Sequence, residues 1–168
     1  GKIMSTEVIR NRVLRIAILT VSDTRTAETD KGGNRVQEIA EAAHFDVVAR
    51  SLVKDDMEAI SNVVEGWISD PSIDVIVTTG GTGIAKRDVT IEAVSSLLDK
   101  KIPGFGELFR YISYVDDIGL RAIASRAIAG VARNSLIFAI PGSVGAVTLA
   151  MERLIVPQIP HLVREITK

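Results

Sequence analysis

The apolar, β-branched run Val75-Ile76-Val77 leads through two threonines into the glycine-rich segment 80–83. Such a run is typical of a central strand in a parallel sheet, which is covered on both faces. Glycine allows positive φ and close approach of the backbone to a ligand, and threonine hydroxyls add hydrogen-bond donors. Open α/β sheets bind ligands where their strands end in such loops. The segment therefore predicts an α/β fold and a phosphate-bearing ligand.

Two well-known phosphate motifs do not match this segment. The Gly-Lys-Ser/Thr of a Walker A loop is missing, and the third glycine of a dinucleotide fingerprint falls on Lys86. A plain strand-to-helix turn is the alternative interpretation. Against it, Lys86, Arg87, Asp88 and Thr90 follow at once, and this combination of charges suits an anion together with a metal ion.

Composition narrows the class of protein. A length of 168 residues fits one domain, which we expect over 13–168 after a flexible segment 1–12 whose residues 1–3 resemble an expression remnant. A net charge of −1 argues against a nucleic-acid partner. Pro141-Gly142 interrupts the longest uncharged stretch, so no membrane span is expected. The absence of cysteine excludes thiolate chemistry, and a cytoplasmic location is the simplest expectation.

Periodicity and turn residues predict an alternating order of strands and helices. The expected strands are 15–21, 45–52, 73–78 and 136–140, and the expected helices are 34–43, 57–69, 89–98, 103–114 and 144–154. Residues 125–131 fit neither pattern, and the proline-containing tail predicts a short final helix. This order predicts three α/β/α layers around a mostly parallel sheet. The turns after strands 15–21, 73–78 and 136–140 would then share one edge and form one composite site.

Five ordered motifs resemble the MoaB/MogA family of molybdenum cofactor biosynthesis proteins. They resemble the MoaB branch more than the MogA branch. They are Leu19-Thr20-Val21-Ser22-Asp23-Thr24-Arg25 with Asp30-Lys31-Gly32-Gly33, Thr78-Thr79-Gly80-Gly81-Thr82-Gly83 with Arg87-Asp88-Val89-Thr90, Pro103-Gly104-Phe105-Gly106-Glu107-Leu108-Phe109-Arg110, Ser125-Arg126-Ala127, and Ile137-Phe138-Ala139-Ile140-Pro141-Gly142-Ser143. The resemblance implies the molybdopterin-binding, MogA-like fold and Mg²⁺- and ATP-dependent adenylylation of molybdopterin. It also implies a homotrimer or homohexamer and other enzymes of the pathway as partners.

The resemblance also implies roles for individual residues. Asp55 and Asp88 would be catalytic and bind magnesium, and the remaining positions would contact molybdopterin or ATP: Ser22, Asp23, Lys31, Gly80, Gly81, Thr82, Gly83, Glu107, Ser125, Arg126, Pro141, Gly142 and Ser143. For Asp55 and Asp88, helix capping is the alternative, because aspartate is a preferred N-cap. A non-catalytic molybdopterin-binding or partner-docking protein, and a nucleotide-binding regulator, are the alternatives for the whole chain.

Overall fold

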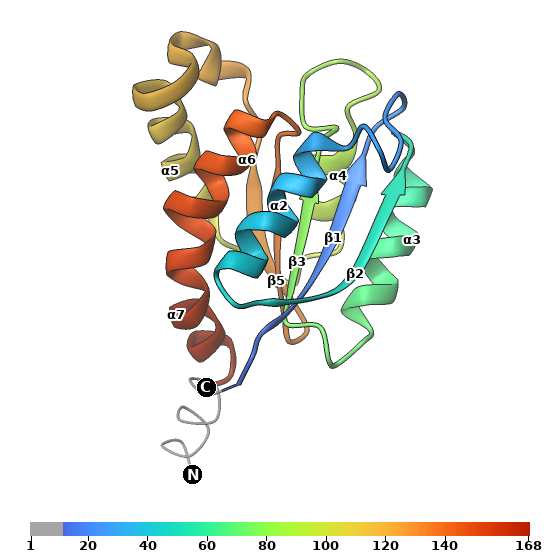
Figure 1. The fold of residues 1–168 in the computed structure, drawn as a ribbon, viewed down its shortest axis with the longest axis vertical. Helices are drawn as coiled ribbons and strands as arrows, with labels where there is room; N and C mark the ends of the chain where they lie inside the picture. Colours follow the sequence, from blue (N-terminus) through green and yellow to red (C-terminus); the bar gives the residue numbers. More distant parts are fainter. Residues whose placement is uncertain (1–11) are drawn as a thin grey trace.

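A six-stranded, mostly parallel sheet forms the centre of the molecule, as the computed structural model shows for residues 12–168 (Figure 1). The strand order is β2-β1-β3-β6-β5-β4. The first four strands in this order are parallel, whereas β5 is antiparallel to β6 and β4 to β5. The strands are β1 (Arg15–Val21), β2 (Asp46–Val53), β3 (Val75–Thr79), β4 (Lys100–Lys101), β5 (Ile128–Ala132) and β6 (Ser135–Ile140).

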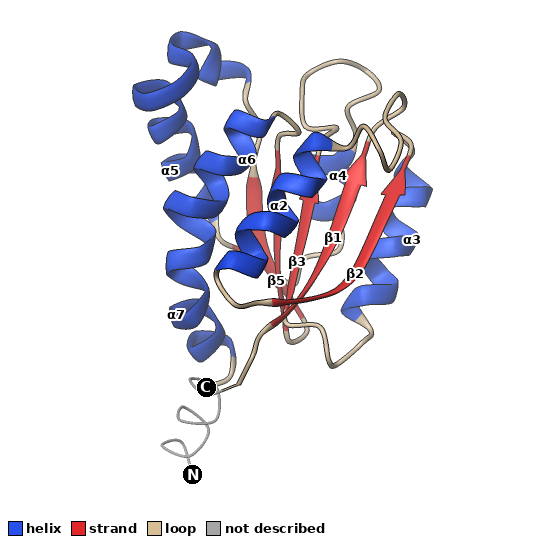
Figure 2. Ribbon diagram, viewed as in Figure 1, coloured by secondary structure: helices blue, strands red, loops and turns tan. Residues whose placement is uncertain are grey.

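Helices cover both faces of the sheet and confirm the predicted three layers (Figure 2). Helices α2 (Lys31–Ala42), α5 (Pro103–Ser113), α6 (Val144–Ala150) and α7 (Val156–Ile166) lie on one face, and α3 (Met57–Ile68) and α4 (Thr90–Ser95) on the other. Phe109 and Phe138 are the largest fully buried side chains. Branched aliphatic residues fill the rest of both cores, as the low aromatic content predicts.

Helices α2 and α4 and strand β5 are among the elements that differ from the sequence prediction. Helix α2 begins at Lys31 rather than at residue 34, because Asp30 caps it by accepting a hydrogen bond from the Gly33 N–H. Helix α4 ends at Ser95, and its N-cap is Val89, without a side-chain bond, rather than Asp88. The ambiguous segment 125–131 contributes β5, whose pairing with β6 extends the sheet.

The chain from Val144 onward forms one longer helical segment rather than two helices separated by prolines. A π-helical turn, η3 (Met151–Ile155), joins α6 to α7, and α7 contains both Pro157 and Pro160. Each proline removes one helical hydrogen bond. Burial of Ile155, Ile159 and Val163 against the sheet outweighs that loss.

Helix α5 continues through a π-helical turn, η1 (Tyr114–Ile118), and a 3₁₀ helix, η2 (Gly119–Ala124). Phe105 and Phe109 pack in the core. Leu108 and Tyr111, on the same helix, are exposed.

The predicted flexible segment 1–12 lies outside the described residues except for Arg12, which forms an ion pair with the nearly buried Asp74 (Nη2–Oδ1 2.8 Å). Within residues 12–168, none of the helices has both the length and the apolar character that crossing a bilayer requires.

Candidate functional site

The three predicted turns meet at the carboxyl edge of the parallel strands. A methyl group built on Gly142 would lie 3.2 Å from the Gly80 α-carbon, and one on Gly32 would lie 2.5 Å from the Gly142 oxygen. The Thr79 hydroxyl donates to the Pro141 carbonyl (3.0 Å). A cleft of about 100 Å³ lies among these turns and is lined by Thr20, Val21, Ser22, Arg25, Asp30, Gly32, Thr79, Gly80 and Gly142. The expected composite edge is therefore present.

Gly80 and Gly81 adopt positive φ values of 97° and 67°, so the loop after β3 has the conformation that its glycines suggest. A methyl group on Gly81 would overlap the Thr90 hydroxyl and come within 3.0 Å of Asp55 Oδ1. The backbone closes the loop there, because the Thr90 N–H donates to the Gly81 carbonyl (3.1 Å). Glycine at position 81 thus brings the loop against Asp55 and Thr90.

Asp55 lies at the end of β2, and its neighbour Asp56 caps α3 by accepting from the Ala59 N–H (2.8 Å). Asp55 is therefore not needed as a cap. Its N–H donates to Asp23 Oδ1 (2.9 Å), which fixes the turn after β1 against the turn after β2. Partial burial first, and then the nearby charges of Asp23 and Asp88, raise the pKa of the Asp55 carboxyl, while Arg87 opposes this shift. A cation bound here would relieve that repulsion.

Asp88 has a different local role from the expected helix cap. Its Oδ2 accepts from the Ala85 N–H (3.0 Å) within the loop that precedes α4. The Gly83 α-carbon faces the same carboxylate, since a methyl group built on it would lie 2.7 Å from Asp88 Oδ2. No cluster of three or more metal-binding side chains exists in the stretch 12–168, so Asp55 and Asp88 would need phosphate oxygens and water to complete a magnesium shell.

Arg126 anchors the glycine-rich loop rather than pointing away from it. Its Nε donates to the Thr82 carbonyl (3.1 Å), and its Nη2 donates to the carbonyls of Gly83 (2.8 Å) and Asp88 (3.0 Å). Glu92 pairs with the same guanidinium, and this hydrogen bond lowers the pKa of the Glu92 carboxyl. The fork of donors on Arg126 therefore holds both ends of segment 83–88.

Asp30 belongs to the site although sequence reasoning assigned a role only to the neighbouring Lys31. Its side chain is almost completely buried and lines the cleft. It accepts from the Thr20 hydroxyl (2.6 Å), the Gly33 N–H (2.9 Å) and Arg50 Nη2 (2.8 Å). The signal was an aspartate immediately before a glycine-rich helix start, which reads equally well as a simple cap.

The structure places the other predicted site residues in different surroundings. Thr82 is buried in the loop, Lys31 is exposed at the start of α2, and the Ser143 hydroxyl oxygen caps α6 by accepting from the Ala146 N–H (3.2 Å). Glu107 does not line the cleft but faces a separate hollow of about 230 Å³ beside Lys101 and Arg110. Ser125 is half-buried next to Arg126.

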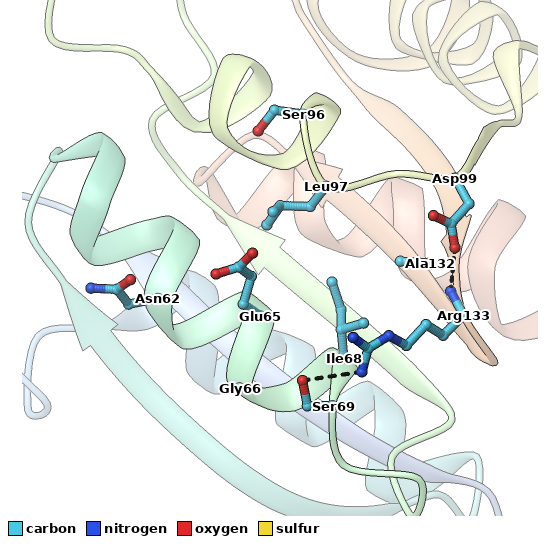
Figure 3. Close-up of a pocket in the computed structure, with 10 residues that line it drawn as sticks. All are labelled: Asn62, Glu65, Gly66, Ile68, Ser69, Ser96, Leu97, Asp99, Ala132 and Arg133. Atoms are coloured by element: carbon cyan, nitrogen blue, oxygen red, sulfur yellow. Dashed lines mark hydrogen bonds between the residues drawn. The ribbon is translucent and has the colours of Figure 1, made fainter.

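The most voluminous hollow described, about 610 Å³, lies elsewhere (Figure 3). It lies beside the carboxyl ends of α3 and α4 and the β5–β6 turn, with Glu65, Leu97 and Arg133 among its lining residues. The β5–β6 turn lies at the amino end of β3, since Leu136 pairs with Val75, whereas Gly80 follows the carboxyl end of that strand. Size alone therefore does not identify the site, and the convergence of loops and carboxylates is the better guide.

Replacing Asp55 by Asn is expected to leave the melting temperature at pH 7 unchanged or slightly higher. Because the pKa is raised in the folded state, the unfolded chain loses its proton first, and the ionised carboxylate destabilises the fold as pH rises above the ordinary value of 3.8. The difference between variant and wild type should vanish below that value. Calorimetric scans between pH 3 and pH 8 measure it, and a variant less stable at pH 7 would contradict the electrostatic assignment.

Arg126→Ala is expected to lower the free energy of unfolding by about 1–3 kcal/mol, because three loop carbonyls lose a charged donor. Arg126→Lys should recover only part of this, since an ammonium group cannot reproduce the fork. The matched control is Arg153→Ala, which breaks only the exposed pair with Asp116 and should cost less than about 1 kcal/mol. Equal losses in denaturant titrations of the two alanine variants would show that Arg126 is not an anchor.

Comparison with known proteins shows the family of the chain. A family model described as "Probable molybdopterin binding domain" matches residues 17–161. The chain belongs to this molybdopterin-binding family of molybdenum cofactor biosynthesis proteins. It is 57% identical over 160 residues to molybdenum cofactor biosynthesis protein B of Staphylococcus aureus, covering 94% of this chain and 95% of that protein. The family resemblance noted from the motifs, including the MoaB branch, is thus confirmed.

Solved structures of family members share the fold. A crystal structure of a molybdenum cofactor biosynthesis protein B is 51% identical and superposes with a TM-score of 0.90 over 93% of this chain and 97% of that chain. The tungsten cofactor synthesizing protein MoaB from Pyrococcus furiosus is 32% identical, with a TM-score of 0.83 over 94% of this chain and 99% of that chain.

Proposed function

We propose that the protein catalyses Mg-ATP-dependent adenylylation of molybdopterin, with release of pyrophosphate. The observation that carries the proposal is the position of Asp55, whose carboxylate lies beside Asp23, Asp88 and the Gly81 backbone in a member of a molybdopterin-binding family. Crowded carboxylates next to an anion-binding loop need a cation, and Mg²⁺ bound to nucleotide phosphates supplies one. Family membership supports the pterin as the second substrate.

The chemistry needs positioning more than a nucleophilic side chain. An oxygen of the terminal phosphate of molybdopterin attacks the α-phosphorus of ATP, a new P–O bond forms, and the bond to the β-phosphate oxygen breaks to release pyrophosphate. Asp55 and Asp88 would hold magnesium, which neutralises charge on the transferring group. N–H groups of segment 80–83 would bind phosphate oxygens, and Arg126 would keep that loop in place through its carbonyl contacts.

The test is whether purified protein consumes ATP only when molybdopterin and magnesium are both present. A coupled pyrophosphate assay should give signal with all three components and none when any one is omitted. ATP that is bound without ever being consumed would favour the alternative, a molybdopterin-binding or partner-docking protein. ATP binding that is independent of the pterin would indicate a nucleotide-binding regulator.

A docking role has one observation in its favour. Leu120 and Ile123 of η2 are 80% and 92% exposed, and Leu108, Tyr111, Tyr114 and Val115 are also exposed along α5 and η1. Monomeric proteins rarely expose so many large apolar side chains along one segment. This surface would fit another molybdenum cofactor biosynthesis enzyme or a second copy of the chain.

We expect the second copy, as a homotrimer or homohexamer. The cleft of about 100 Å³ is smaller than the few hundred Å³ that ligand sites of this size class usually have, so a neighbouring subunit would help to complete it. Light scattering of the full chain at micromolar concentration should return three or six subunits. Leu120→Glu with Ile123→Glu should lower that number, whereas a wild-type monomer would remove the proposal. For the proposed biosynthetic function we expect a cytoplasmic location.

A further inference from the structure

Thr90, the first residue of α4, has a side-chain hydroxyl that is completely buried and has no hydrogen-bond partner. In the described part of the chain, Thr78 is the only other residue with such a hydroxyl. A buried hydroxyl without a partner destabilises a fold, and valine would fill nearly the same space without that cost. The fold alone therefore does not explain a threonine at position 90.

The surroundings of the hydroxyl explain the presence of threonine at position 90 better. A methyl group on Gly81 would overlap this hydroxyl and lie 3.0 Å from Asp55 Oδ1, so both oxygens face the same side of the Gly81 α-carbon. The Thr90 backbone is fixed there, because its N–H donates to the Gly81 carbonyl. Because position 81 has no side chain, the hydroxyl and the Asp55 carboxylate oxygen border the same small space, together with a methyl group of Val21. The donor without an acceptor thus lies next to a crowded, partly buried acceptor.

We propose that Thr90 is a positioning residue for Asp55, whose carboxylate accepts a hydrogen bond from the Thr90 hydroxyl when it binds Mg-ATP. This inference rests on the proposed function in so far as Mg-ATP is the ligand. The hydrogen bond selects one rotamer of Asp55, so that a carboxylate oxygen points at the metal. Gly81 is required in this arrangement for two reasons: its φ is positive, and a side chain there would occupy the space that the Thr90 hydroxyl and Asp55 Oδ1 share.

The experiment compares Thr90→Val and Thr90→Ser with wild type by calorimetric titration with Mg-ATP and by thermal unfolding. Thr90→Val should bind Mg-ATP on the order of tenfold more weakly while its melting temperature stays the same or rises, because the lost hydroxyl has no partner in the unliganded protein. Thr90→Ser should stay within about twofold of wild type. Thr78→Val is the matched control, another buried hydroxyl without a partner, and should leave Mg-ATP affinity unchanged.

A second arm tests the coupling to Asp55. In an Asp55→Asn background, Thr90→Val should cause no further loss of Mg-ATP affinity, because the group that the hydroxyl orients has already lost its charge. Full additivity would overturn the inference, as would wild-type affinity in Thr90→Val. A wild-type protein that binds Mg-ATP but releases no pyrophosphate with molybdopterin would instead contradict the proposed function, and the affinities would still decide the role of Thr90. No binding of Mg-ATP by wild type would overturn both.

Discussion

Asp55→Asn and Asp88→Asn are each expected to slow pyrophosphate release by on the order of a hundredfold or more, with a change in melting temperature of only about a degree or two. The rate falls because each substitution removes a charge that the metal needs. The fold is spared because Asp56 provides the α3 cap, and because Asn at position 88 keeps an oxygen for the Ala85 N–H. The measurements are turnover with molybdopterin present and thermal unfolding of each variant.

Asp56 supplies the matched control, since it is the next carboxylate along the chain and its side chain caps α3, whereas Asp55 Oδ1 faces Gly81. Asp56→Asn should keep both rate and stability. Asp56→Ala should lose about 1 kcal/mol of stability and keep its rate. If Asp56→Asn were as slow as Asp55→Asn, general loss of charge at this edge would explain the effect. Wild-type turnover in both Asp55→Asn and Asp88→Asn would remove their catalytic role.

Gly81→Val is expected to abolish turnover and also to lower the melting temperature by several degrees. A side chain at position 81 would overlap the Thr90 hydroxyl and approach Asp55. The residue must also keep φ near 67°, which a β-branched side chain disfavours. The smaller Gly81→Ala should still cost on the order of a hundredfold in rate, because displacements of about 1 Å at a reacting centre have such effects.

The control for Gly81 is Gly66, an exposed glycine inside α3 where, apart from its chain neighbours and the helix's own backbone, nothing lies within 4 Å of a built methyl group. Gly66→Ala should raise stability by roughly 0.5–1 kcal/mol through helix propensity and leave turnover unchanged. A Gly81→Ala variant that behaved like Gly66→Ala would show that segment 80–83 is only a turn.

The parallel part of the fold was readable from the sequence because its strands β1, β3 and β6 are buried on both faces. Arg15–Val21 was predicted with its observed bounds, and β6 was predicted to within one residue. The β5 strand was not, since Ile128–Ala132 is short, contains Gly130, and depends on pairing with β6. The final helix was misjudged because local proline rules were outweighed by burial of Ile155 and Ile159.

The site was predictable at the level of turns but not of side-chain contacts. Three glycine-bearing turns at one edge follow from strand order alone. The sequence presents Asp55 and Asp56 equally as caps for α3, and only the backbone conformation at Asp56 shows that this residue is the cap. The burial of Asp30 with Arg50 depends on how β2 pairs with β1, which no local pattern reveals. The hydrogen bonds from Arg126 to the carbonyls of Thr82 and Asp88 likewise join residues about forty positions apart in the sequence.

The most direct test of adenylylation is mass spectrometry of the reaction of wild-type protein with molybdopterin, ATP and magnesium. We expect a product whose mass is that of molybdopterin plus one adenylyl group, formed with pyrophosphate in equal amount. The same mass should be missing when Asp55→Asn replaces wild type under identical conditions. Unmodified pterin beside unconsumed ATP, from protein shown to bind both, would contradict the proposed reaction.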